Sequence, residues 1–216
     1  MNNNSIRNIL CVGAHPDDIE LMAGGTLAKW ISEGYSVHVL TISDGIWTNP
    51  SGIVMREREI ALQEEIDAAN FLGYSVENLN LPAMDIQFQD SLVVEILKRV
   101  EGHHIDTMII PWERDLHHDH EVVSRIALSA SRRVPRLIMG QINYYLSDVF
   151  TPNLFVDISD FWDRKIEALK CYSTQWDRAG SDWIDFLDET TRYYGKMAGV
   201  KRAEGFITKK FLLDNC

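Results

Sequence analysis

The sequence has few cysteines, and their positions exclude two kinds of site. Only three occur among 216 residues, Cys11, Cys171 and Cys216. They are odd in number, lie far apart and form no CxxC pair, so neither a disulfide framework nor a zinc cluster with thiolate ligands is supported. Any metal ion bound by this chain would need histidine and carboxylate ligands.

Long hydrophobic runs and positive charge are also scarce. No apolar run approaches the roughly 18 residues that span a membrane, and residues 1–7 lack the apolar core of a signal peptide. The chain has 21 Lys and Arg against 32 Asp and Glu, and its net charge of −11 would repel nucleic acid and anionic lipid. We therefore expect a cytoplasmic protein with neither nucleic acid nor a membrane as partner.

Motifs that bind nucleotide phosphates are absent too. The glycines Gly24 and Gly25 do not form a GxGxxG pattern, and no Walker sequence occurs. A nucleotide cofactor is therefore poorly supported.

Alternating strand and helix patterns fill the chain. An apolar fraction of 45% over 216 residues suits one domain, which we expect to cover 1–216, with a flexible tail at 1–7 and a C-terminal strand and helix extension at 141–216. The order predicts an α/β fold built on a doubly wound, mostly parallel sheet. The predicted strands are 8–13, 37–42, 79–81, 107–110, 141–146 and 154–158, and the predicted helices are 25–33, 56–72, 92–100, 121–132 and 161–172.

The first predicted strand ends in a polar loop with metal-binding potential. His15 and Asp18 are three residues apart in a turn that Pro16 stiffens, so an imidazole and a carboxylate can converge there. Taken alone, the loop is equally well explained by Asp17 or Asp18 capping the following helix. Its position at the carboxyl end of a parallel strand is where such sheets bind ligands.

A second polar loop, rich in histidine, follows the strand at 107–110. His117 and His120 are three apart, on one face of the start of a helix, with Asp119 beside them. A solvated turn would have the same composition, but two such loops at the strand ends of one sheet are more specific. Together they can supply His15, Asp18 and His120, three nitrogen and oxygen ligands that leave a fourth position for water, as in catalytic zinc sites.

These motifs resemble the LmbE-like, or PIG-L, family of zinc-dependent de-N-acetylases. The resemblance rests on AHPDDIE at 14–20, Gly24-Gly25, Pro111 and the pattern Asp115-x-His117-x-Asp119-His120, and it extends over roughly the first 170 residues. It implies a Rossmann-like core similar to lactate dehydrogenase. It further implies hydrolysis of the N-acetyl group of an N-acetylglucosamine-type sugar, sugar conjugate or nucleotide sugar.

The resemblance also assigns roles to individual residues. His15, Asp18 and His120 would bind the metal, which is usually Zn²⁺, although Fe²⁺ also fits two histidines and one carboxylate. Asp17 would be the general base. His117 would stabilise the oxyanion, with Asp119 orienting it and raising its pKa.

Several points stay open at this stage. The alternatives are a non-catalytic metal-binding member of the fold, or a hydrolase of a different amide or ester. Either Arg56 or Arg58 could contact substrate, and Met22 and His118 depart from the family pattern. The aromatic residues after 160 fit a core or subunit interface better than a wall for stacking sugars, and family members often form homo-oligomers.

Overall fold

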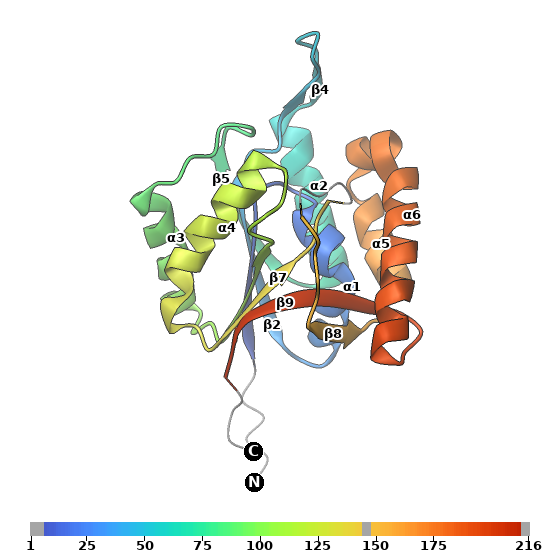
Figure 1. Cartoon of the computed structure of the whole chain (residues 1–216). Coiled ribbons are helices and arrows are strands. Elements are labelled where there is room, and N and C mark those ends of the chain that lie inside the picture. The colour runs from blue at the N-terminus through green and yellow to red at the C-terminus, as the bar shows by residue number, and fades with distance from the viewer. Residues whose placement is uncertain (1–6, 144–147, 213–216) are drawn as a thin grey trace.

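The computed structural model describes residues 7–143 and 148–212 of the chain (Figure 1). Within these ranges the strands are β1 (Asn8–Gly13), β2 (Ser36–Ser43), β3 (Trp47–Thr48), β4 (Val54–Arg56), β5 (Ser75–Leu81), β6 (Thr107–Pro111), β7 (Arg136–Gly140), β8 (Leu154–Asp157) and β9 (Ala203–Phe211). The α-helices are α1 (Asp18–Ser32), α2 (Arg58–Leu72), α3 (Asp90–Gly102), α4 (His118–Ala130), α5 (Trp162–Lys170) and α6 (Ser173–Ala198), and a short 3-10 helix covers Ser131–Arg133.

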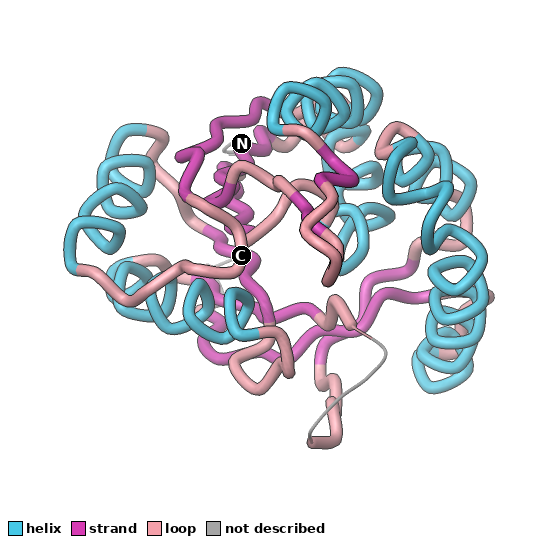
Figure 2. The backbone as a smooth tube through the Cα atoms, turned by 90° about the horizontal axis from the view of Figure 1, so that it is seen from above, coloured by secondary structure: helices cyan, strands magenta, loops and turns pink. Residues whose placement is uncertain are grey.

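Seven strands form one central sheet, in the order β5-β2-β1-β6-β7-β9-β8. The five strands from β5 to β7 run parallel, and β9 pairs antiparallel with both β7 and β8. Helices α3 and α4 cover one face, and α1, α2, α5 and α6 cover the other (Figures 1 and 2). The predicted α/β fold with a mostly parallel sheet is therefore confirmed.

Strand β1 shows how the sequence produces this layering. Successive side chains of a strand point to opposite faces. Leu10 and Val12 accordingly join the core under α3 and α4, while Ile9 and Cys11 join the core under α1 and α5. Because both faces are buried, the strand is apolar throughout instead of alternating with polar residues.

The sheet brings the two polar loops together. Strands β1 and β6 are neighbours, and the helices that follow them, α1 and α4, leave toward opposite faces. The loops at 14–17 and 112–117 therefore begin at the same edge of the sheet, where the winding direction changes. This is the position at which open α/β sheets bind ligands.

Helix α1 begins at Asp18, seven residues before the predicted start. Gly24 and Gly25 interrupt the apolar pattern there because α1 packs closely against the C-terminal part of the chain. A Cβ atom on Gly25 would lie 2.8 Å from Cδ1 of Ile158. Gly24 and Gly25 therefore lie within a helix, where their small size permits close packing, and not in a loop.

The predicted strand at 141–146 is wrong over residues 141–143. The strand is β7, which ends at Gly140, and residues 141–143 are irregular, while 144–146 lie outside the described residues. Arg136 and Gly140 leave an apolar run of only three residues between them, which hid the strand. Neither the 26-residue helix α6 nor β9 was predicted within the C-terminal extension.

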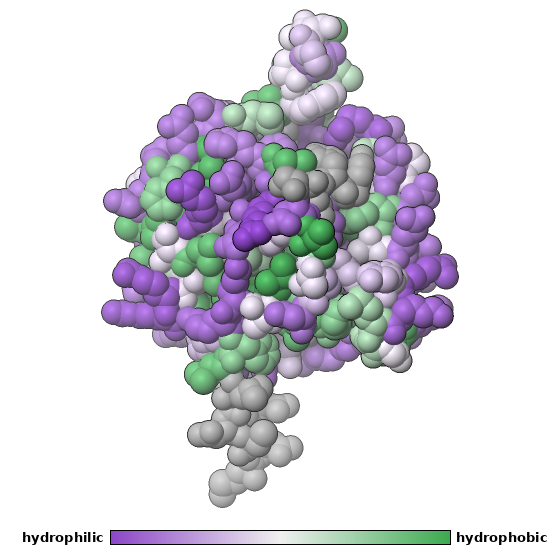
Figure 3. All heavy atoms as spheres, viewed as in Figure 1, coloured by the Kyte–Doolittle hydropathy of each residue, from purple (hydrophilic) through white to green (hydrophobic). Residues whose placement is uncertain are grey.

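The hydropathy of the surface and of the helices was compared with that expected of a membrane span. On the face drawn in Figure 3, hydrophilic residues prevail and hydrophobic ones form smaller groups among them. Across 7–143 and 148–212, no helix has the length and apolar character needed to cross a membrane. Most of the predicted tail, residues 1–6, lies outside the described residues.

Candidate active site

Asp18 folds the loop after β1 into a tight turn. Its Oδ2 accepts hydrogen bonds from the backbone N–H groups of Ala14, at 2.8 Å, and His15, at 2.9 Å. Asp17 adopts a backbone conformation with φ of 106°, which is costly for a residue with a side chain and is enriched at functional sites. The turn directs the His15 ring toward the second loop.

The second loop is organised by the start of α4. His117 caps this helix, because its Nδ1 accepts a hydrogen bond from the backbone N–H of Asp119 at 3.3 Å. Asp115 Oδ1 accepts from the backbone N–H of His117 at 2.8 Å. His120 then lies in the first turn of α4, where its buried ring faces the first loop.

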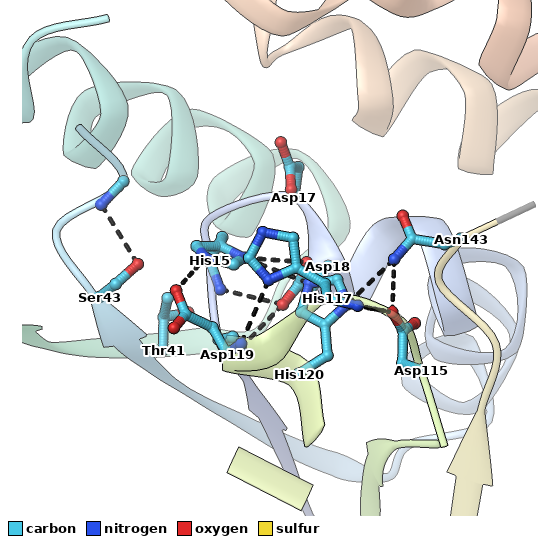
Figure 4. A network of polar contacts seen from close by, with 12 residues as sticks. His15, Asp17, Asp18, Thr41, Ser43, Asp115, His117, Asp119, His120 and Asn143 are labelled. Carbon is cyan, nitrogen blue, oxygen red and sulfur yellow. Dashed lines mark hydrogen bonds and ion pairs between the residues drawn. The ribbon is translucent and has the colours of Figure 1, made fainter. Parts of the chain in front are cut away.

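Side chains of the two loops meet at the edge of the sheet (Figure 4). His15 Nδ1 lies 3.2 Å from His120 Nε2. Asp18 Oδ1 lies 3.1 Å from His120 Nε2 and 3.7 Å from His15 Nδ1. A nitrogen of His117 is also near, since one nitrogen from each of the three histidines lies within 4.8 Å of the others.

The triangle formed by His15 Nδ1, His120 Nε2 and Asp18 Oδ1 has the size of a metal site. Ligand atoms about 2.0–2.2 Å from one tetrahedral ion are about 3.4 Å from one another. The three edges of 3.2, 3.1 and 3.7 Å are close to that separation. The donor set of two imidazoles and a carboxylate therefore fits a divalent ion such as Zn²⁺ or Fe²⁺.

A carboxylate supports each of the two histidines from behind. Asp119 Oδ2 lies 2.9 Å from His15 Nε2 and accepts the backbone N–H of Met84 at 2.7 Å. Asp115 Oδ1 lies 3.2 Å from His120 Nδ1. Such partners commonly fix the orientation of metal-binding histidines.

The contact made by Asp119 corrects one expectation. Its carboxylate contacts His15 and not His117, whose Nδ1 instead accepts the backbone N–H of Asp119. The supporting role of Asp115 was not predicted, although it stands in the same sequence motif. Asn143, which donates to Asp115 Oδ1 at 2.6 Å, carried no signal in the sequence.

The aspartates of the cluster favour the positively charged form of its two buried histidines. Burial opposes the charged form of His15, but hydrogen bonds to Asp119 and Asp18 raise its pKa to about 9. Burial likewise opposes charge on His120, and Asp18 and Asp115 raise its pKa to about 10. Burial also disfavours charge on Asp18, yet the two histidines hold its pKa well below the usual value.

Asp17 stands apart from this cluster and points away from it in Figure 4. Burial raises the pKa of Asp17 to about 7, against the opposing effect of Arg56. Arg56 Nη1 lies 3.8 Å from Asp17 Oδ2, whereas the half-exposed Arg58 pairs with Asp44 at 3.0 Å. Of the two candidate arginines, Arg56 is therefore the one at the site.

The charge state expected for His117 is also corrected. Burial and, to a smaller extent, the positive charges of His120 and His15 lower its pKa to about 4. Because its Nδ1 accepts the cap hydrogen bond, the neutral ring carries its proton on Nε2. His117 is thus a neutral hydrogen-bond donor.

A pocket of about 330 Å³ opens over the cluster. No sequence pattern pointed to the part of its wall that comes from β3, but Trp183 in α6 belongs to the aromatic group noted above. Met22 instead packs against Gly140, and His118 is exposed, so neither lines this pocket. The lining residues outside the two loops include Leu21, Trp47, Arg56, Met84, Ile142, Asn143, Gln175, Arg178, Ala179 and Trp183.

Fold and site together define an α/β protein with a candidate metal cluster of histidine and aspartate at the carboxyl edge of a parallel sheet. Residues 10–131 match the PIG-L family, described as GlcNAc-PI de-N-acetylase. Since this match covers more than half of the 216 residues, the chain belongs to the PIG-L family of enzymes.

Several known proteins are similar over most of the chain. The diacetylchitobiose deacetylase of Thermococcus kodakarensis is 31% identical over 225 residues, which cover 94% of this chain and 83% of that protein. A conserved protein of Thermus thermophilus has a TM-score of 0.82 at 27% identity, covering 97% of this chain and 98% of that one. The 4-carboxy-2-hydroxymuconate hydratase of Pseudomonas putida shares the fold, with a TM-score of 0.80 at 17% identity and coverage of 98% and 99%.

Proposed function

We propose that this protein is a metal-dependent de-N-acetylase acting on an N-acetylglucosamine-type sugar. The observation that carries this proposal is the meeting of three ligand atoms, from His15, Asp18 and His120, in a pocket that Asp17 also lines. Membership of the PIG-L family and the similarity to a diacetylchitobiose deacetylase support the same reaction. We also propose that residues 1–216 form a single domain with a Rossmann-like core.

His15, Asp18 and His120 would hold the metal ion. The carboxylates of Asp119 and Asp115 keep the two rings in place and favour positive charge between them. A bound Zn²⁺ or Fe²⁺ would lower the pKa of a water molecule and attract electrons from the acetyl oxygen.

Asp17 would be the general base. Its carboxylate accepts a proton as the water oxygen bonds to the acetyl carbon, and a pKa near 7 suits a group that must also give that proton back. The proton goes to the amide nitrogen as the carbon–nitrogen bond breaks. Acetate and the free amine are released, and Asp17 is again a carboxylate.

His117 would stabilise the negative oxygen that develops on the acetyl group. Its neutral ring offers Nε2–H from the pocket wall without needing a positive charge. Arg56, beside Asp17, would bind a hydroxyl or the acetamido group of the sugar. A volume of about 330 Å³ is at the small end of small-molecule pockets, which range over about 300–1,000 Å³, and suits one sugar unit.

The reaction can be tested with a small panel of substrates. Protein loaded with Zn²⁺ or Fe²⁺ is incubated with N-acetylglucosamine, N,N′-diacetylchitobiose, an acetyl-lysine peptide and 4-carboxy-2-hydroxymuconate. Acetate and primary amine are measured for the first three substrates, and loss of absorbance for the fourth. We expect acetate and amine in equal amounts from the sugars, and none after treatment with a chelator.

Two results would contradict the proposal. A preference for the peptide would assign the chain to another class of amide hydrolase. Consumption of the muconate without any acetate release from the sugars would favour a hydratase, the activity of one enzyme that shares this fold.

A further inference from the structure

A small separate cavity lies behind one wall of the pocket. Its volume is about 20 Å³, enough for about one water molecule, and the residues that line it include Leu21, Gln141, Lys165 and Leu187. Leu21 also lines the pocket over the histidine and aspartate cluster, as does Ile142, the neighbour of Gln141. Leu21 and Ile142 therefore belong to a partition between the pocket and the small cavity.

Leu21 is held firmly in this partition. Its backbone N–H donates to the carbonyl oxygen of Asp17 at 3.0 Å, and its own carbonyl oxygen accepts from Lys165 Nζ at 2.7 Å. Lys165 is itself buried and pairs with the buried carboxylate of Glu204. The side chains of Leu21 and Ile142 belong to the same hydrophobic core cluster. Because protein interiors are close-packed, a wall held in this way resists displacement by a larger ligand.

The partition lies next to the proposed metal ligands. Leu21 follows Asp18 by three positions in α1, so the two side chains lie on the same side of the helix. Ile142 directly precedes Asn143, whose Nδ2 lies 3.3 Å from Nδ1 of His120. Leu21 and Ile142 are both buried. Together they present a fixed apolar surface to the pocket beside the cluster.

The proposed reaction leaves one group of the substrate for this apolar surface. The acyl carbon of an amide carries an oxygen, a nitrogen and an alkyl group. In the proposed function the oxygen faces the cluster and His117, and the nitrogen receives its proton from Asp17. The alkyl group, which is a methyl in an acetamide, gains most from an apolar contact. Leu21 and Ile142 can supply that contact.

We propose that Leu21 and Ile142 set the length of the acyl group that the protein removes, so that acetyl is accepted and longer acyl groups are excluded. This inference rests on the proposed function and concerns the acyl end of the substrate, whatever the sugar. A propionyl group adds one methylene, which would collide with the partition. The small cavity behind the partition could take up that methylene only if the side chain at position 21 were shorter.

The test compares three acyl groups on one sugar. Values of kcat/KM for N-acetyl-, N-propionyl- and N-butyrylglucosamine are measured for the Zn²⁺-loaded wild type, Leu21→Val and Leu21→Ala. We expect the wild type to disfavour propionyl against acetyl by roughly 10- to 200-fold, the usual effect of one methylene in a tight pocket. In Leu21→Ala the ratio of propionyl to acetyl should rise by about tenfold, because the shorter side chain opens the small cavity. Leu21→Val, which removes less volume, should shift the ratio in the same direction.

Leu187→Ala is the matched control. Leu187 is a buried leucine of α6 that lines the small cavity and is not among the described residues that line the pocket. The substitution enlarges the cavity from its far side and leaves the partition intact, so the ratio of propionyl to acetyl should equal that of the wild type. An unchanged ratio in both Leu21 variants, or the same rise in Leu187→Ala, would overturn the proposal.

A binding measurement separates this inference from the reaction. Calorimetric titration of the same Zn²⁺-loaded proteins with aceto-, propiono- and butyrohydroxamic acid measures the preference for acyl length whether or not a sugar is hydrolysed, since hydroxamates bind metal ions directly. If none of the three sugars is hydrolysed, the proposed function fails. An affinity that falls with acyl length in the wild type and not in Leu21→Ala would still support the partition. The same dependence on acyl length in both proteins would overturn it.

Discussion

The adjacent residues Asp17 and Asp18 face different surroundings, and their substitutions should therefore have different effects. Asp18 is in contact with His120, whereas Asp17 points away from the cluster. Asp17→Asn should keep the metal and lower kcat by roughly 10²- to 10⁴-fold, the usual contribution of a general base. Asp18→Ala should lose the metal. Metal analysis of the purified variants beside their kcat values distinguishes the two roles, and metal loss in Asp17→Asn alone would reverse them.

Asp119 and His117 offer a second comparison at the scale of single residues. Because the Asp119 carboxylate contacts His15, Asp119→Ala should weaken metal affinity by about 10- to 100-fold. His117→Ala should lower kcat strongly while metal affinity stays within a few-fold of the wild type, since the proposed ligands are intact. Metal titration against a chelating indicator measures both variants. Tight metal binding in Asp119→Ala together with loss of metal in His117→Ala would contradict this division.

At the scale of elements, Glu64 in α2 connects Arg56 to the start of α6. Its Oε2 lies 3.1 Å from Arg56 Nη2, and its Oε1 accepts from the Ser173 hydroxyl at 2.9 Å and the Thr174 N–H at 2.7 Å. One buried carboxylate thus holds the arginine beside Asp17 and the start of α6, the helix from which Gln175 and Trp183 line the pocket.

Glu64→Gln should disturb both elements together. The neutral side chain removes the anionic partner of Arg56 Nη2, so we expect kcat/KM to fall by roughly 10- to 100-fold and the free energy of unfolding to fall as well. Kinetics and urea denaturation measure the two effects. Glu167→Gln, an exposed glutamate paired with Lys170, is the control and should change neither. Unchanged kinetics in Glu64→Gln would show that Arg56 needs no such anchor.

The sequence predicted the parts of the fold and site that depend on local patterns. Strand β1 and the proposed ligands His15, Asp18 and His120 could be predicted because an apolar run and a His/Asp motif are visible within a few residues. The partner of Asp119 could not, because Asp119 and His15 are 104 positions apart and meet only where the loops after β1 and β6 come together. Likewise, Trp47 and Arg178 are 131 positions apart, and only the packing of α6 beside the β3–β4 hairpin brings them together.

For the whole molecule, buried carboxyl groups should make stability depend on pH. Burial raises the pKa of Glu65 from 4.5 to about 7, although hydrogen bonds from Thr41 and Asn78 oppose the shift. Between these values the folded protein keeps a proton that the unfolded chain has lost. The free energy of unfolding should therefore fall as pH rises from about 4.5 to 7, by about 3 kcal/mol from this group alone.

Glu65→Gln removes that titration while keeping a similar shape. Urea denaturation of chelator-treated protein at several pH values should show a shallower decline for the variant than for the wild type across this window. Parallel curves for the two proteins would mean that Glu65 has an ordinary pKa in the folded state.

The place of β9 in the sheet determines how late during synthesis on the ribosome the fold can be completed. It lies between β7 and β8, both of which are synthesised before it, and within 7–143 and 148–212 it is the one strand that pairs with β8. Glu204 of β9 also accepts the backbone N–H groups of Gly25 and Thr26 in α1, the helix that begins with Asp18. A nascent chain stalled before Ala203 would contain every histidine and aspartate of the site, yet α1, the helix that carries Asp18, would lack the hydrogen bonds that Glu204 of β9 accepts.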